Sequence, residues 1–330
     1  MKQLFLFLCI VSAGITTSAT IIRVNNNPGI NANFNSAQSA HNAANNGDTI
    51  HLETSLISYG SVTATKQLVW MGNGYFVDPT RAATLDAISF NVGSANSVVM
   101  GLYVSSHIFV STNNISVSRC NIYIIYLDAM VANRSHDFSL TQSMVTSSIQ
   151  TSYSSSPLAS SNYTFTNNVI NGTLNLPPVF SSIILIHNFI YSLNSNTVAF
   201  VVNNNIINGS NGNPLICTYS INVYNNLFMN FSNSNYVGSN GNIYTASNPT
   251  SSSNTTFISS VTSSSDLWLT LKSLSPAIGA GLGGVDIGPL GGSAPYKFSG
   301  IPSIPTFSQF QFQSTPVNSL PVIISTRSNN

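Results

Sequence analysis

A short phrase of one small or amide residue followed by two apolar residues recurs between residues 101 and 228. Its instances are Gly101-Leu102-Tyr103, Asn121-Ile122-Tyr123, Ser143-Met144-Val145, Asn168-Val169-Ile170, Asn188-Phe189-Ile190, Asn205-Ile206-Ile207 and Asn226-Leu227-Phe228. A period of about 20, with β-branched and aromatic residues beside a turn-prone amide, is typical of a parallel β-solenoid. We therefore expect an all-β fold, a single-stranded parallel β-helix whose coils pair with the coils above and below.

Asparagine suits the corner of such a coil for two reasons. It tolerates left-handed backbone angles, and its amide forms local hydrogen bonds. Stacked asparagines can also bond to one another along the solenoid axis, as in other stacked β-structures. The apolar pair after each amide would start the next strand and place one side chain in the core.

Two alternatives explain the phrase differently. Asn-rich, low-complexity sequence could produce it by chance, but the apolar pairs are large and most lie near another apolar run, such as Ile183 to Ile186. Leucine-rich repeats share the period, but they need Leu at fixed offsets and a returning helix. This stretch has few leucines and no helical pattern, so the solenoid is favoured.

The composition limits the partners of the chain. Only 5% of its 330 residues are charged and the formal net charge is +1, with no basic stripe. A nucleic-acid partner therefore has no electrostatic support. A surface of amides, hydroxyls and aromatic rings could bind a neutral polysaccharide or cell-surface glycan, or it could be an inert extracellular surface. We expect a monomer.

The first nineteen residues have the pattern of a secretory signal peptide. A weakly basic start precedes the apolar run Leu4 to Ile15, and small residues follow up to Ala19. The run is too short to span a membrane, and no other segment reaches eighteen apolar residues. We expect cleavage after Ala19, no transmembrane segment, and a secreted protein that is extracellular or associated with the envelope.

Residues 36–46 contain the one expected helix. Small residues and His41 recur at helical spacing in Ser36 to Ala44, and Asn45-Asn46-Gly47 ends the pattern. Such a helix before the first coil would cap an open solenoid end. His41 could be a ligand, but a histidine on a packing face is more often structural.

Two segments resemble a known family. Residues 34–53, FNSAQSAHNAANNGDTIHLE, and the phrase Thr65 to Phe76 resemble the N-terminal cap and early coils of right-handed parallel β-helix proteins of the pectin-lyase-like superfamily. Ser275 to Gly281 and Val285 to Pro289 resemble the glycine-rich ending of secreted bacterial members. The resemblance implies a right-handed β-helix domain over residues 20–302, with residues 275–302 closing the last coil. Asp286 would accept backbone N–H bonds in that closure. No catalytic signature is shared.

The mature chain would keep two cysteines, Cys120 and Cys217. Four or five coils separate them, roughly 20 Å at the spacing of stacked strands, whereas the α-carbons of a disulfide lie within about 7 Å. We therefore expect two free thiols. No cysteine or histidine spacing predicts a metal site.

One local cluster could carry chemistry. Asp128, Arg134, His136 and Asp137 hold four of the few ionisable groups of the repeat region, where the interval between phrases widens. His136 with Asp137 could act as acid and base while Arg134 engages an acidic sugar, as in a polysaccharide lyase or glycoside hydrolase. No cofactor is expected, and calcium is a possible one only if the protein is such an enzyme. The alternative is a solvated turn with an incidental ion pair.

Tyrosines also recur with the coils and could form a stripe that stacks on sugars. They are Tyr103, Tyr123, Tyr126, Tyr163, Tyr191 and Tyr224. The alternative is a set of packed side chains. Residues 232–265 are expected to be loop or irregular coil, and residues 303–330 a tail with one short strand near Leu320 to Ser325. The overall expectation is a secreted or cell-surface, non-catalytic β-helix protein, which could bind glycans or other surface polymers along its side. A purely structural surface protein and a polysaccharide-cleaving enzyme are the alternatives.

Overall fold

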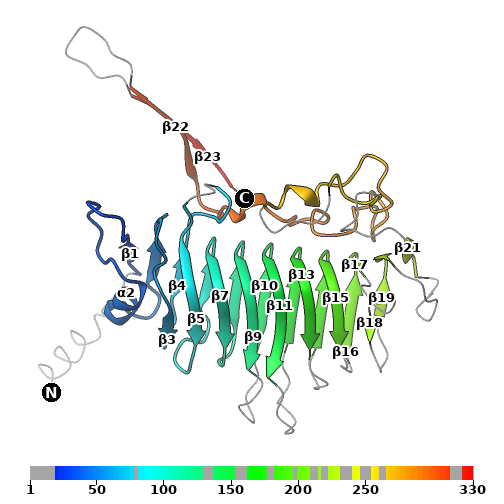
Figure 1. Cartoon of the computed structure of the whole chain (residues 1–330), viewed down its shortest axis with the longest axis horizontal. Coiled ribbons are helices and arrows are strands. Elements are labelled where there is room, and N and C mark those ends of the chain that lie inside the picture. The colour runs from blue at the N-terminus through cyan, green and yellow to red at the C-terminus, as the bar shows by residue number, and fades with distance from the viewer. Residues whose placement is uncertain are drawn as a thin grey trace, which may run out of the picture.

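The structure is a computed structural model and shows a parallel β-solenoid, as the repeat predicts (Figure 1). The residues that it describes are 19–77, 81–128, 137–152, 162–176, 182–195, 199–208, 215–216, 222–230, 240–245, 254–259, 265–312 and 322–329.

Two parallel sheets form the body of the solenoid, and successive strands from β2 to β17 alternate between them. The strands of sheet 1, in order, are β1 (Ile21–Val24), β2 (Thr49–Leu52), β4 (Val69–Met71), β6 (Val98–Met100), β8 (Ile115–Ser118), β10 (Phe138–Thr141), β12 (Asn162–Thr166), β14 (Ser182–Ile186), β16 (Ala199–Asn203) and β19 (Asn222–Tyr224). Those of sheet 2 are β3 (Val62–Ala64), β5 (Thr84–Phe90), β7 (Tyr103–Val110), β9 (Asn121–Asp128), β11 (Met144–Ser152), β13 (Val169–Leu176), β15 (Phe189–Ser195), β17 (Ile206–Asn208), β20 (Leu227–Met229) and β21 (Ile243–Thr245), and β18 (Leu215–Ile216) pairs with β15.

The core fills the space between the sheets because alternate residues of each strand point inward. In sheet 1 one inward row contains Trp70, Val99, Val117, Leu140 and Phe165, which occupy the same register position in successive coils and are fully buried. Burying one such side chain stabilises the fold by about 1.5–3 kcal/mol relative to leaving it exposed. The repeat therefore adds a similar apolar contribution with every coil.

Two adjacent residues share the corner between the sheets. The first adopts a left-handed backbone, with φ of 55° at Asn167 and 58° at Asn204. The second, such as Asn168 or Asn205, is fully buried and belongs to an axial ladder of amides. The predicted asparagine ladder is confirmed, but the left-handed residue is the one before it. The sequence predicts both the left-handed backbone and the amide ladder for the same asparagine of each phrase.

The apolar pair after each ladder residue divides between two cores. The second member, such as Ile170 or Ile190, packs in the solenoid interior. The first member, such as Val169 or Phe189, belongs to a separate buried cluster with Trp268. This second cluster explains why the phrase needs two consecutive large apolar residues in a strand that would otherwise alternate.

The second cluster is covered by residues 265–302, which we call the strap. Figure 1 shows this segment passing back over the sheets from the C-terminal coils toward the N-terminal ones. It bonds to one left-handed corner after another. Asn225 Nδ2 donates to Ala280 O (3.3 Å), Asn204 Oδ1 accepts from Leu282 N (2.8 Å), Asn167 Nδ2 donates to Gly291 O (2.8 Å), Gln142 Nε2 donates to Pro295 O (2.7 Å) and Arg119 Nη1 donates to Ile301 O (2.9 Å).

The expectation that residues 275–302 close the last coil is therefore wrong, since they seal one corner along the length of the solenoid. Within the strap, Asp286 Oδ1 accepts from Gly279 N at 2.9 Å, as expected.

The helix α2 (Ala37–Ala43) lies at the N-terminal end of the solenoid (Figure 1). Ser36 is its N-cap and accepts from Ser39 N. His41 is buried, accepts from Thr65 N at 3.0 Å and stacks on Trp70 with 6.1 Å between ring centroids. The predicted helix and the structural role of His41 are confirmed.

A hairpin of β22 (Thr306–Phe312) and β23 (Val322–Arg327) follows the strap and projects from the solenoid (Figure 1). The expected late strand is β23, and its antiparallel partner β22 was not predicted. Asn329 ties the base of the hairpin to the body, because its carbonyl accepts from Arg119 Nη1 at 2.8 Å.

Candidate functional site

The predicted acid–base cluster falls mostly outside the described residues. Arg134 and His136 lie there entirely, and Asp128 is placed only as the last residue of β9. Asp137 is described, just before β10. Its Oδ1 accepts from Asn162 N at 3.0 Å and from Asn162 Nδ2 at 2.9 Å, in the next coil. This carboxylate thus links two coils, and the catalytic role of the cluster stays a prediction.

The six tyrosines do not form one stripe. Tyr163 is 1% exposed and belongs to the solenoid core. Tyr103 and Tyr191 are partly buried against the second cluster. Tyr123 is 48% exposed on sheet 2, whereas Tyr224 is 40% exposed on sheet 1. Tyr123 and Tyr126 therefore share the outer part of sheet 2, and Tyr191 lies on the same sheet at the edge of the second cluster.

A kink across sheet 2 positions two of these tyrosines. The register shifts between Val145 and Ser148 in β11 and between Ile170 and Thr173 in β13. At the kink, β9 contributes one residue, Tyr123, and β15 contributes one residue, Tyr191. The strands between them contribute two small or polar residues each, Thr146-Ser147 and Asn171-Gly172.

We call the residues at the kink of β9, β11, β13 and β15 the kink row. Within it, Tyr123 and Tyr191 flank the small or polar side chains of β11 and β13. Three strand steps separate the two tyrosines, about 14 Å at the spacing of stacked strands. Gly172 is required in this floor, since a Cβ there would collide with the carbonyl oxygen of Ser147. A Cβ-bearing residue would push the two backbones apart and disturb the floor.

A second group of polar and aromatic side chains lies beside the kink row. His107 meets Tyr126 edge to face, with ring centroids 5.8 Å apart, and its Nδ1 lies 3.0 Å from Ser106 Oγ. Gln150 Nε2 donates to Ser148 Oγ at 2.8 Å. We call the set Ser106, His107, Tyr123, Tyr126, Ser147, Gln150, Gly172 and Tyr191 the tyrosine face. No lysine or arginine belongs to it, and one exposed carboxylate, Asp86 of β5, lies beside it opposite Ser105-Ser106 in the kink.

Several ionisable groups whose pKa is perturbed by burial lie elsewhere, under the strap. The Tyr296 hydroxyl contacts the Tyr75 hydroxyl and donates to Asp266 Oδ2 at 3.0 Å, and Ser299 N donates to the same oxygen at 2.6 Å. Burial raises the pKa of the Asp266 carboxyl above its usual range. Burial also raises the pKa of the nearby Cys120 thiol to about 12. These groups are sealed from solvent and fasten the strap.

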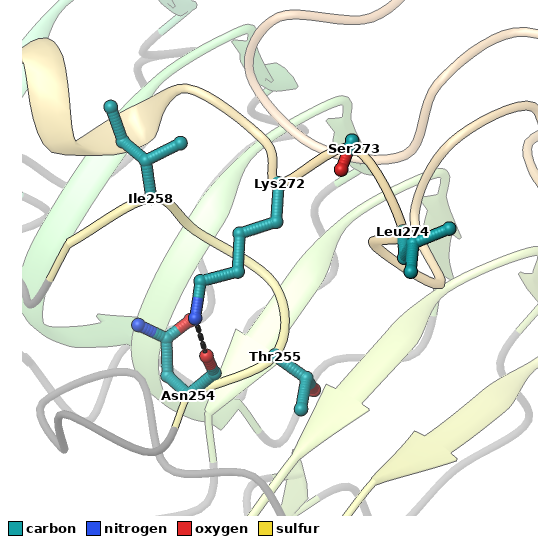
Figure 2. Close-up of a pocket in the computed structure, with 6 residues that line it drawn as sticks. All are labelled: Asn254, Thr255, Ile258, Lys272, Ser273 and Leu274. Atoms are coloured by element: carbon teal, nitrogen blue, oxygen red, sulfur yellow. Dashed lines mark hydrogen bonds between the residues drawn. The ribbon is translucent and has the colours of Figure 1, made fainter.

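A separate open pocket of about 550 Å³ lies beside the strap and is lined by Asn254, Thr255, Ile258, Lys272, Ser273 and Leu274. Figure 2 shows the Lys272 side chain reaching across it to the carbonyl oxygen of Asn254. The ammonium group therefore joins the two segments that form the pocket. The Lys272 ammonium group therefore makes a structural contact within the protein and is not directed toward a ligand.

Other features of the described residues bear on function. No three His, Cys, Asp or Glu residues of the described ranges lie together as metal ligands. None of the described helices has the length and apolar character needed to cross a lipid bilayer. Cys120 is a free, buried thiol as predicted, and Cys217 lies outside the described residues.

Comparison of the chain with protein-family models, with curated proteins and with solved structures gives no match. The β-solenoid that the family resemblance implies is present. Membership of the pectin-lyase-like superfamily stays a prediction.

Proposed function

We propose that this protein is a secreted or surface-exposed β-solenoid that binds a neutral glycan along the tyrosine face. The observation that carries the proposal is the kink row, in which Tyr123 and Tyr191 flank a floor of small polar residues. Tyrosine offers a large, rigid contact area at low entropic cost and a hydroxyl for hydrogen bonding. The row follows the solenoid axis, so an extended chain could contact several coils at once.

The lack of cationic side chains on the tyrosine face favours a neutral glycan. Hydroxyl, amide and imidazole groups can donate to and accept from sugar hydroxyls. An acidic polysaccharide would need cationic partners, and the tyrosine face contains no lysine or arginine. The proposal therefore concerns neutral polysaccharides, with no reaction required.

Affinity gel electrophoresis tests the proposal. The mature protein should be retarded by at least one neutral polysaccharide in a panel of neutral and acidic ones. Tyr123→Ala should weaken that binding by about 5- to 30-fold, because losing one aromatic contact costs about 1–2 kcal/mol. Tyr224→Ala is the matched control, since it removes a similarly exposed tyrosine from sheet 1.

Two results would contradict the proposal. One is unchanged migration with every neutral polysaccharide. The other is depolymerisation of a polysaccharide, with or without calcium, that His136→Ala or Asp137→Ala abolishes. The second result would establish the enzyme alternative and place its site in the 128–137 cluster.

A further inference from the structure

The outer face of sheet 1 differs from the tyrosine face in its regularity. The outward residues of β4 to β16 form two rows that run along the axis without a register shift. One row is Val69, Val98, Ser116, Ser139, Thr164, Ile184 and Val201. The other is Met71, Met100, Ser118, Thr141, Thr166, Ile186 and Asn203.

The centre of this face is a grid of six hydroxyl groups. The adjacent strands β8, β10 and β12 contribute two hydroxyls each, and all six side chains are partly exposed. The grid repeats every 4.8 Å or so from strand to strand, and about every 6.6 Å along a strand, where it takes every second residue. Ser139 Oγ donates to Ser116 Oγ at 2.9 Å, so neighbouring hydroxyls are already aligned along the axis.

The grid is held rigidly from behind. The inward residues between the hydroxyls, Val117, Leu140 and Phe165, are fully buried. The asparagine ladder begins immediately beyond the strand ends, where Ser143 N donates to Asn168 Oδ1 at 3.0 Å. Threonine adds stiffness because its branched Cβ restricts χ1. Hydroxyl positions on such a face are therefore fixed by the backbone repeat.

The side chains of the two rows favour a partner that carries no charge and has a regular structure. No charged residue occurs in either row from Val69 to Asn203. Apolar side chains flank the grid on both sides, with Val98 and Met100 before it and Ile184 and Ile186 after it. From β4 to β16 the rows contain no aromatic side chain on which a sugar ring could stack, and His51 of β2 and Tyr224 of β19 extend the second row at its two ends. Hydroxyls that donate and accept, held between apolar groups, impose a regular arrangement on the first layer of water.

We propose that this hydroxyl grid is an ice-binding site, which adsorbs to a crystal face of ice through its ordered first layer of water. A regular grid of neutral donors and acceptors suits a crystalline array of water molecules, which presents the same two kinds of group and no charge. The site lies on sheet 1, and the proposal is independent of glycan binding on sheet 2.

Ice-affinity partitioning of the mature protein tests this site. A seeded ice crystal is grown slowly from a dilute protein solution, and the protein concentrations in the melted ice and in the remaining liquid are compared. The native protein should be enriched in the ice relative to an inert globular protein in the same solution. It should also separate the melting and freezing points in osmometry.

Two variants and a control assign the effect to the grid. Ser139→Lys places a long charged side chain at the centre, and Thr164→Val removes one hydroxyl while keeping the shape. Both should lose enrichment in ice. Asn175→Lys adds the same charge at an exposed position of sheet 2 and should behave like the native protein. Exclusion of the native protein from ice, or unchanged enrichment of both grid variants, would overturn the proposal.

Discussion

Asn188 and Asn205 occupy the same corner of adjacent coils, and each amide group serves both coils at once. Asn205 Oδ1 accepts from Asn188 N at 2.8 Å and from Asn188 Nδ2 at 2.9 Å. The same Asn188 Nδ2 also donates to Phe165 O at 2.8 Å, one coil back. Both side chains are fully buried, so these bonds replace the water that the corner backbone would otherwise need.

Asn188→Leu should therefore destabilise the solenoid strongly. The substitution removes the acceptor of Asn168 N and leaves buried backbone groups of two coils unsatisfied, at about 1–3 kcal/mol for each group. Guanidinium unfolding should show a lower midpoint than that of the native protein. Asn194→Leu, at an exposed position of β15, is the matched control and should change the midpoint little. Equal effects of the two substitutions would contradict the ladder's role.

Gly172 should be intolerant of any side chain. An added Cβ would overlap the carbonyl of Ser147 in the adjacent coil, and backbone cannot move aside as a flexible side chain can. Gly172→Ala should therefore lower both the unfolding midpoint and any binding to the tyrosine face. Gly29→Ala provides the comparison, because that glycine has a φ of 79° but nothing within 4 Å of the added Cβ. It should incur only the cost of backbone strain, about 1–2 kcal/mol.

The solenoid was predictable because its physical cause is repeated in the sequence. Each coil needs a corner amide and large apolar residues, and these recur near a period of 20 as Asn168, Asn188, Asn205 and Asn226. The position of the strap was not predicted because its corner partners lie 55 to 182 residues away in sequence, as Asn225 and Arg119 show. No local pattern encodes contacts at such separations.

The kink row was hidden for a different reason. Tyr123 and Tyr191 belong to different coils, and only the one extra residue in each of β11 and β13 places them at opposite ends of one floor. A change of register between strands is not visible in composition or spacing. The alternation in Ser139-Leu140-Thr141 and Thr164-Phe165-Thr166 was visible, and it would have revealed the hydroxyl grid once aligned by the repeat.

Cys120 should resist thiol reagents in the native protein. Its side chain is fully buried, and burial raises its pKa to about 12, so hardly any reactive thiolate exists at pH 8. In a Cys217→Ser background, a chromogenic disulfide reagent should react only after guanidinium unfolds the chain. Labelling of the folded protein at the rate of a free thiol would show that the 119–121 corner is open.

Asp266 should make the stability of the protein depend on pH in the direction opposite to that of a paired surface carboxylate. Its folded-state pKa is raised, chiefly by burial, so the folded protein holds the proton more tightly than the unfolded chain does. This contribution to stability is fully present below the unfolded pKa of about 3.8. It is lost as pH rises through the folded pKa.

Asp266→Asn removes that titration while keeping an oxygen for Ser299 N and Tyr296 Oη. The free energy of unfolding of the variant minus that of the native protein should therefore increase with pH through this window and then level off. Guanidinium titrations of both proteins at a series of pH values measure the difference. Glu53→Gln is the reverse case, because hydrogen bonds from Asn25 and Arg23 hold the pKa of Glu53 below its usual range despite burial. Its difference should fall as pH rises from the lowered folded pKa of Glu53 to the unfolded value of about 4.5, and parallel curves for the two variants would refute the assignment.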